Sequence, residues 1–228
     1  MNSLSIDSLF SVAGKVVLVT GGSRGIGEMI AAGFLANGAT VYVSSRKADV
    51  CDATAARLAE AHHGKCVSLP ADLSNLEGVD VLGSALRERE DHLDVLVNNA
   101  GASWGASIEE FPEVGWDKVM DTNVKGVFFL TQRLLPMLEA AATPEDPARV
   151  INIGSVDGIK TPQFDTWSYG PSKAALHALT RQMGARLVRR GRVGTPEDVA
   201  GLAIYLASRA GAFTVGDTIT CDGGLVAT

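Results

Sequence analysis

Cysteine is scarce in this sequence, and long apolar runs are absent. The 228 residues include only three cysteines, Cys51, Cys66 and Cys221, at wide and irregular spacing. That pattern fits neither a disulfide framework nor paired zinc-ligand motifs. No stretch reaches the length needed to span a bilayer, and the first residues lack the basic and apolar regions of a secretory signal. We therefore expect a cytoplasmic protein that holds no metal.

Basic residues are also in short supply. Lysine and arginine number 20 against 26 aspartate and glutamate residues, which gives a net charge of −6. No overall basic field would attract nucleic acid or an anionic membrane, so we expect a small-molecule substrate as the partner. The four histidines show no metal-ligand spacing and are assigned to surface or packing roles: His62, His63, His92 and His177.

The hydrophobic pattern alternates between short β-branched runs and longer helical periods. This alternation predicts an α/β fold, a single-domain Rossmann-type doubly wound parallel sheet with helices on both faces, over residues 1–228. The expected strands are 16–20, 41–43, 65–69, 95–98, 150–153 and 218–221. The expected helices include one through Met29 and Leu35 and others at 53–61, 76–89, 119–138 and 195–208, with a further one carrying Tyr169 and Lys173.

A glycine-rich loop follows the first strand, with the sequence Thr20-Gly21-Gly22-Ser23-Arg24-Gly25-Ile26-Gly27. Glycines allow a tight turn and let backbone amides approach a pyrophosphate at a helix N-terminus, where the helix dipole also favours an anion. Flavins, other nucleotides and ligand-free turns can use such loops too. Its position between an expected strand and an expected helix favours a dinucleotide.

The end of the second strand indicates which dinucleotide binds. The sequence there, Ser44-Ser45-Arg46-Lys47, has no carboxylate to hold the ribose hydroxyls of NAD. Arg46 instead offers a guanidinium for a 2′-phosphate, and Arg24 in the glycine loop can approach the same group. Either arginine could be an ordinary solvated surface charge. Two positive charges without a carboxylate favour NADP(H) over NAD.

Tyr169 and Lys173 are four residues apart on an expected helix, so their side chains share one face. A free tyrosine hydroxyl titrates near pH ~10, and an adjacent ammonium favours the phenolate and lowers that value. The pair is therefore a candidate for proton transfer at neutral pH. Alone, the same spacing favours a surface pair over a catalytic one.

Several motifs in this order resemble the short-chain dehydrogenases/reductases along nearly the whole chain: Thr20-Gly21 with Gly25 and Gly27, Asn98-Asn99-Ala100-Gly101, Ser155, and Tyr169 with Lys173. The resemblance implies an NADP-dependent oxidoreductase in which Tyr169 donates a proton and Lys173 also holds the nicotinamide ribose. It further implies that Ser155 bonds the substrate carbonyl, that Asn123 positions a water, and that the protein is a tetramer. Ser155 could instead bond its own backbone, and Asn123 could merely interrupt a helix.

The same resemblance completes the expected site. Asp72-Leu73 would border the adenine, and Asn98 to Gly101 would support the sheet end beside the cofactor, with Asn98 itself favoured as structural. The expected catalytic residues are Asn123, Ser155, Tyr169 and Lys173; the expected cofactor-binding residues are Gly21, Ser23, Arg24, Gly25, Ile26, Gly27, Ser45, Arg46, Asp72, Leu73, Asn99, Ala100, Gly101, Tyr169 and Lys173.

The chain departs from that family near residues 188–191. The family has a further strand, a Pro-Gly turn and a substrate lid there, and none of these is found in the sequence. The strand at 218–221 would lack its parallel neighbour, with backbone groups left unpaired. We therefore expect that the printed sequence omits a mobile segment. An intact mass of 23.8 kDa would contradict this expectation, and a real deletion would impair cofactor binding and activity.

The residues expected to line the substrate pocket are apolar and aromatic: Ser103, Trp104, Ile159, Phe164 and Trp167. They favour an extended apolar carbonyl compound. The stretches 103–106, 147–155 and 169–177 are most similar to the NADPH-dependent β-ketoacyl reductases, including the branch associated with rhamnolipid synthesis. We thus expect reduction of a 3-oxoacyl thioester. The alternatives are a sugar, polyol or secondary-alcohol dehydrogenase, and an NADP-binding sensor or scaffold without turnover.

Overall fold

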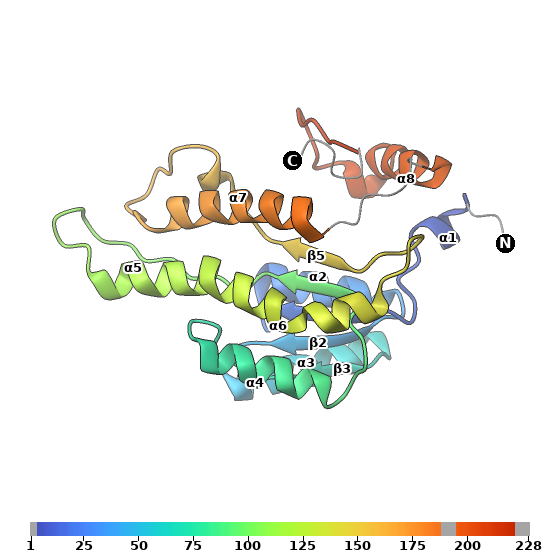
Figure 1. Ribbon diagram of the computed structural model, residues 1–228, viewed down its shortest axis with the longest axis horizontal. Coiled ribbons are helices and arrows are strands. Elements are labelled where there is room, and N and C mark those ends of the chain that lie inside the picture. Colours follow the sequence, from blue (N-terminus) through green and yellow to red (C-terminus); the bar gives the residue numbers. More distant parts are fainter. Residues whose placement is uncertain (1–3, 188–194, 222–228) are drawn as a thin grey trace. The chain divides into compact units, whose positions relative to one another are not determined.

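A parallel five-stranded sheet forms the centre of the protein in the computed structural model, which describes residues 4–187 and 195–221 (Figure 1). The strand order is β3-β2-β1-β4-β5, so the chain winds outward from β1 in both directions. The strands are β1 (Val16–Thr20), β2 (Thr40–Ser44), β3 (Cys66–Ser68), β4 (Val95–Asn98) and β5 (Arg149–Asn152). The doubly wound α/β fold expected from the sequence is confirmed.

Two apolar layers cover the sheet because side chains alternate between its faces along each strand. On one face Leu18, Tyr42 and Leu96 pack against α4 (Leu76–Arg87) and α6 (Gly126–Ala141). On the other face the intervening valines pack against α2 (Gly25–Ala36) and α3 (Ala48–His62). Burial on both faces explains why these strands are almost continuously apolar.

The remaining helices are α1 (Ile6–Leu9), α5 (Glu113–Met120), α7 (Tyr169–Leu187) and α8 (Pro196–Ala207), with short 3-10 turns at Val156–Gly158 and Arg209–Gly211. Among the described residues, 12–177 form one compact unit, and 4–11 with 178–187 and 195–221 form another. The sheet and both apolar cores belong to the first unit. No helix in the described ranges is long and apolar enough to cross a membrane, and these ranges hold no cluster of three or more metal-ligating side chains.

Two expected elements need correction. The single helix expected at 119–138 is interrupted by a π-helical turn, Asp121–Lys125, which joins α5 to α6. The strand expected at 218–221 does not form, and these four residues are exposed. A strand needs a neighbour to pair its backbone groups, and the described sheet contains no pairing partner for this segment. The departure expected at 188–191 lies outside the described residues.

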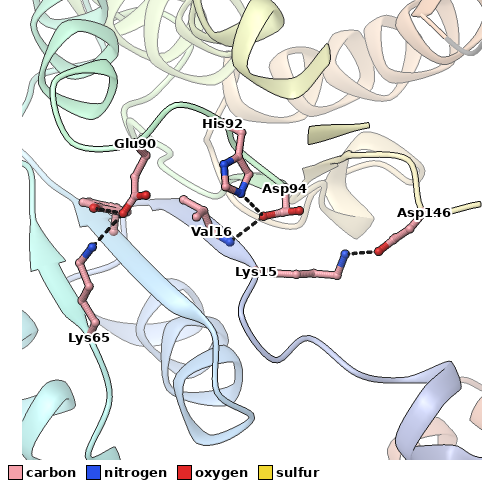
Figure 2. Close-up of polar contacts among 8 residues, drawn as sticks. Lys15, Val16, Lys65, Glu90, His92, Asp94 and Asp146 are labelled. Carbon is pink, nitrogen blue, oxygen red and sulfur yellow. Dashed lines mark hydrogen bonds and ion pairs between the residues drawn. The ribbon is translucent and has the colours of Figure 1, made fainter. Parts of the chain in front are cut away.

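The amino ends of the strands are joined by half-buried and exposed polar contacts (Figure 2). The Asp94 carboxylate accepts a 2.7 Å hydrogen bond from the backbone N–H of Val16, which ties the start of β1 to the segment before β4. Glu90 accepts from the Tyr42 hydroxyl at 2.5 Å and from the Lys65 ammonium at 2.8 Å. These contacts lie at the opposite end of the strands from the glycine loop, and they stabilise the sheet rather than a site.

Candidate functional site

The glycine loop between β1 and α2 is held in a shape that only glycine tolerates at several positions. Gly21 and Gly25 have φ values of 63° and 56°, in the left-handed region. A Cβ at Gly27 would lie 2.3 Å from the carbonyl oxygen of Gly21 and 2.4 Å from Nδ2 of Asn99. Any side chain at Gly27 would therefore push the loop away from the end of β4.

Thr20 and Asn99 join the ends of β1 and β4 beneath this loop. The Thr20 hydroxyl donates to the carbonyl of Val97 at 3.2 Å and accepts from the backbone N–H groups of Asn99 and Ala100, each at 3.0 Å. Nδ2 of Asn99 donates to the carbonyls of Thr20 at 2.9 Å and Gly21 at 3.2 Å. Nδ2 of Asn98 instead donates to Oδ1 of Asn152 at 2.9 Å and to the Thr131 hydroxyl at 3.3 Å, contacts of the kind expected for the structural role favoured from the sequence.

A cavity of about 520 Å³ opens at the carboxyl ends of the strands, where ligands bind in open α/β sheets. Twelve expected cofactor-binding residues line it: Gly21, Ser23, Arg24, Gly25, Ile26, Ser45, Arg46, Asp72, Leu73, Asn99, Ala100 and Gly101. Three expected residues do not line the cavity. Gly27 packs against Gly21 and Asn99 instead, and Tyr169 and Lys173 lie outside the lining. Sequence reasoning missed Ser44, Lys47, Val50, Ala71, Ala102 and Thr122. Most of these residues are next to an expected cofactor-binding residue in the sequence, and this proximity could have indicated that they line the same cavity.

Positive charge dominates the cavity beside β2. Arg24, Arg46 and Lys47 line it, against the single carboxylate of Asp72. None of the ion pairs formed within the described part of the chain uses these three cations. Asp72 accepts from the backbone N–H of Ser74 at 3.0 Å. The cations are therefore available to an anionic ligand.

Lys173 brings its ammonium to the meeting point of β5, α7 and the loop after β4. Its Nζ donates to the carbonyl of Ile153 at 2.7 Å and lies 5.8 Å from the centre of the Tyr169 ring. A Cβ at Gly101 would be 3.9 Å from the same Nζ. The side chain is buried, and burial lowers the pKa of Lys173 below its ordinary value. The bond to Ile153 could not be anticipated from local sequence, because it joins residues 20 positions apart.

Asn123 lies in the π-helical turn and is fully buried. Its carboxamide oxygen accepts from the N–H of Ala102 at 2.7 Å, and its Nδ2 donates to the Ala102 carbonyl and to the Ser172 hydroxyl, each at 2.9 Å. The Ser172 hydroxyl in turn donates to the carbonyl of Tyr169 at 2.7 Å. The side chain thus connects the loop after β4 to the start of α7, and both of its N–H groups are used by protein acceptors.

Ser155 follows β5 and caps the 3-10 turn Val156–Gly158. Its Oγ accepts from the backbone N–H of Asp157 at 3.2 Å, which is the local backbone bond considered from the sequence. The hydroxyl proton is not consumed by that bond and can be donated to another oxygen. The backbone N–H of Ser155 donates to Nε2 of His177 at 3.5 Å, a contact that sequence reasoning missed.

The residues expected to line a substrate pocket are only partly brought together. Trp104 stacks on the backbone of Gly115 in α5, with the Lys118 ammonium 5.4 Å from its ring centre. The Trp167 indole donates to the carbonyl of Ala106 at 3.1 Å and so ties two loops together. By contrast, Ile159 and Phe164 are 82% and 78% exposed, Ser103 is exposed, and none of the expected pocket residues lines the cavity described above.

Comparison with known proteins finds close relatives along almost the full length. The chain is 46% identical to the rhamnolipids biosynthesis 3-oxoacyl-[acyl-carrier-protein] reductase of Pseudomonas aeruginosa, over 94% of this chain and 97% of the relative. It is 31% identical to the gluconate 5-dehydrogenase of Gluconobacter oxydans, over 97% of this chain and 98% of the relative. A solved structure, the Pseudomonas aeruginosa RhlG/NADP active-site complex, matches with a TM-score of 0.77 at 46% identity, over 95% of this chain and 98% of that one.

Each alignment with a relative has more positions than the number of residues that this chain contributes to it. The Pseudomonas alignment covers 251 positions, whereas 94% of 228 residues is about 214, so about 37 aligned positions have no residue here. The Gluconobacter alignment has 259 positions against about 221 residues, a difference of about 38. Two different relatives thus carry a similar length of sequence that this chain lacks.

The family model of the short chain dehydrogenases matches residues 15–195, which include the glycine loop, all five strands and the whole of α7. This agreement and the identity over nearly the whole length place the chain: it belongs to the short-chain dehydrogenase family of oxidoreductases.

Proposed function

We propose that this chain is an NADPH-dependent reductase that converts the ketone of a 3-oxoacyl thioester to a secondary alcohol. The observation that carries the proposal is the position of the Lys173 ammonium, between the Tyr169 ring at 5.8 Å and the Gly101 edge of the nucleotide cavity. The substrate class is supported by the relative at 46% identity, whose name specifies a 3-oxoacyl reductase.

The residues around the cavity fit a dinucleotide phosphate. Gly21 and Gly25 line the cavity with positive φ values, so the backbone of the glycine loop and a ligand can approach closely there. Arg24, Arg46 and Lys47 would hold the 2′-phosphate of the adenosine ribose, and the α2 N-terminus would hold the pyrophosphate. The cofactor supplies the hydride that reduces the substrate carbon.

The chain's own residues supply and direct the proton. Tyr169 donates its hydroxyl proton to the carbonyl oxygen as the carbon accepts hydride, so the C=O π bond is replaced by new C–H and O–H bonds. The ammonium of Lys173 stabilises the resulting phenolate until solvent returns the proton. The Ser155 hydroxyl keeps its proton and donates a hydrogen bond to the same substrate oxygen, which stabilises the negative charge that develops there.

We assign Asn123 a role in positioning the site through its hydrogen bonds to Ala102 and Ser172, and not in binding a water at its amide nitrogen. Both N–H groups of its side chain are occupied by Ala102 and Ser172, so we assign it to fixing α7 relative to the loop after β4. Ser172 passes that constraint to the Tyr169 backbone. The proposed catalytic set therefore keeps the four expected residues but gives Asn123 a positioning role.

One observation favours a second candidate, an NADP-binding protein with little turnover. About 37 positions of the relatives have no counterpart in this chain. We propose that they correspond to the strand, Pro-Gly turn and lid expected near residues 188–191, which would border the nicotinamide and the substrate. The gap is either a real deletion or a segment omitted from the printed sequence. The intact mass of the protein distinguishes the two, because 23.8 kDa corresponds to the printed residues alone and an omitted segment would add to it.

The test of the proposed function is consumption of NADPH, and separately of NADH, with a 3-oxoacyl thioester. The wild-type protein should consume NADPH in preference, and Tyr169→Phe should lower kcat by about 10²- to 10⁴-fold, the range for loss of a general acid. NADPH binding, followed by its fluorescence, should be unchanged in the variant. Binding without consumption across thioesters, sugars and alcohols would favour the second candidate.

A further inference from the structure

His177 is the third residue, after Tyr169 and Lys173, in a series spaced by four along α7. This spacing places all three on one side of the helix. The backbone N–H of Ser155 donates to Nε2 of His177 at 3.5 Å. The helix that carries the proposed proton donor therefore also contacts the segment that carries the proposed carbonyl-binding serine.

The His177 imidazole packs closely against the backbone of Gly154 and Gly158. A Cβ at Gly154 would lie 2.3 Å from Nε2 of His177, and a Cβ at Gly158 would lie 2.9 Å from its Cε1. Neither glycine has a positive φ, so backbone conformation does not demand glycine at either position. The absence of a side chain at Gly154 makes room for the His177 ring, and its absence at Gly158 makes room for both the ring and the α7 backbone at Lys173 and Ala174.

We propose that His177 is a positioning residue that holds Ser155 in register with Tyr169 and Lys173. Its Nε2 accepts the Ser155 N–H, which requires a neutral imidazole with its proton on Nδ1. From the same helix, Lys173 holds the backbone two residues before Ser155, through its 2.7 Å bond to the carbonyl of Ile153. Two side chains of α7 thus hold the backbone on both sides of Gly154 and set the distance from the Ser155 hydroxyl to the proton donor.

The Ser155 hydroxyl needs this support because its own contacts are local. Its Oγ accepts from Asp157 in the same turn, and that bond fixes the rotamer but does not connect the turn to α7. A misplacement of about 1 Å at a reacting centre can cost about 10²-fold in rate. The proposal rests on the proposed function, in which Ser155 bonds the substrate oxygen.

The test compares His177→Leu with His177→Gln. Leucine keeps apolar volume without an acceptor, whereas the glutamine Oε1 can reach toward the position of Nε2 and accept the same N–H. We expect kcat for ketone reduction to fall about 10- to 100-fold in the leucine variant and to recover most of this loss in the glutamine variant. The Kd for NADPH should change less than about two-fold, because Ser155 does not line the nucleotide cavity.

A second readout does not depend on turnover. The Ser155 amide should exchange its hydrogen faster in His177→Leu than in the wild type, and His177→Gln should restore protection, measured by mass spectrometry on peptides containing residues 150–158. Equal kcat in the two variants, or unchanged Ser155 exchange in His177→Leu, overturns the positioning role while the proposed function stands. A wild-type protein that reduces no ketone overturns the proposed function, and the positioning role with it.

Discussion

The described residues from Val16 to Leu138 differ sharply in packing from those that follow. The strands β1 and β4 are buried at every position, whereas β5 alternates between exposed and half-buried residues. Helix α6 buries seven residues, but α8 buries none. Beyond Leu138, Leu176 is the only buried apolar side chain in the ranges that the structure describes. We call residues 16–138 the well-packed region, because they hold nearly all of the buried apolar side chains that the structure describes.

The largest expected effect comes from breaking the well-packed region at the glycine loop. Gly27→Val places a side chain 2.3 Å from the Gly21 carbonyl oxygen, so we expect loss of detectable NADPH binding and a decrease of about 1–3 kcal/mol in the free energy of unfolding. Fluorescence titration and urea unfolding measure the two effects. Gly33→Ala, in the same helix with no atom within 4 Å of its Cβ, is the control and should stabilise by about 0.5–1 kcal/mol. Equal behaviour of the two variants would contradict the tight packing.

The next effect separates chemistry from packing at Lys173. Lys173→Met should lower kcat by about 10²- to 10⁴-fold, because the phenolate of Tyr169 loses its nearby cation. Stability at pH 7 should hold or rise, since removal of a buried charge offsets the lost bond to Ile153.

The sign of the pH dependence provides a further check on Lys173. Burial lowers the pKa of Lys173, so the unfolded chain holds more protons between that lowered value and the ordinary value of 10.5. The wild type should therefore gain stability as pH rises through this interval, and Lys173→Met should lose that part of the gain. Urea unfolding at several alkaline pH values measures it, and identical slopes in the two proteins would argue against a buried ammonium.

A smaller effect is expected on the preference between NADPH and NADH, from the exposed Arg46 that lines the cavity. Arg46→Asp should lower kcat/KM for NADPH by about 10- to 100-fold, as expected for loss of charge-assisted hydrogen bonds, and raise it for NADH. Arg46→Ala is the matched control, because it removes the cation without adding a carboxylate for the ribose hydroxyls. It should weaken the use of NADPH without improving that of NADH. An unchanged cofactor ratio in both variants would mean that Arg46 does not contact the 2′-phosphate.

Local pattern was sufficient to predict the strands and the glycine loop of the well-packed region, and insufficient to predict the contacts that join distant segments. The strand 95–98 and the glycine loop were predicted because β-branched runs and glycine spacing are short-range signals. The Thr20 hydroxyl, which bonds residues 77 to 80 positions away, has no such signal, and neither has the contact of His177 with Ser155. The prediction of a strand at 218–221 was wrong, because it used a local pattern whereas a strand forms only beside a neighbouring strand.

The smallest expected effect lies in the polar contacts at the amino ends of the strands (Figure 2). Burial by itself raises the pKa of Glu90, but the hydrogen bonds from Lys65 and Tyr42 outweigh it and lower that pKa below its ordinary value of 4.5. The same contacts raise the pKa of Lys65 above 10.5. Glu90 therefore contributes its full stabilisation above about pH 4.5 and loses it as pH falls through the lowered pKa, while Lys65 loses its contribution only as pH rises through its raised pKa.

Glu90→Gln should accordingly lower the free energy of unfolding by about 1 kcal/mol at pH 7, a value reduced for the solvent exposure of Lys65, and the difference should shrink below pH 4. Urea unfolding at both pH values measures it. Glu88→Gln is the control, since that side chain is 74% exposed and its contact with Arg89 is 3.6 Å long. A difference that grew in acid would reverse the sign of the Glu90 contribution. A loss as large for Glu88→Gln would show that the contacts of Glu90 with Tyr42 and Lys65 contribute no more stability than an exposed ion pair.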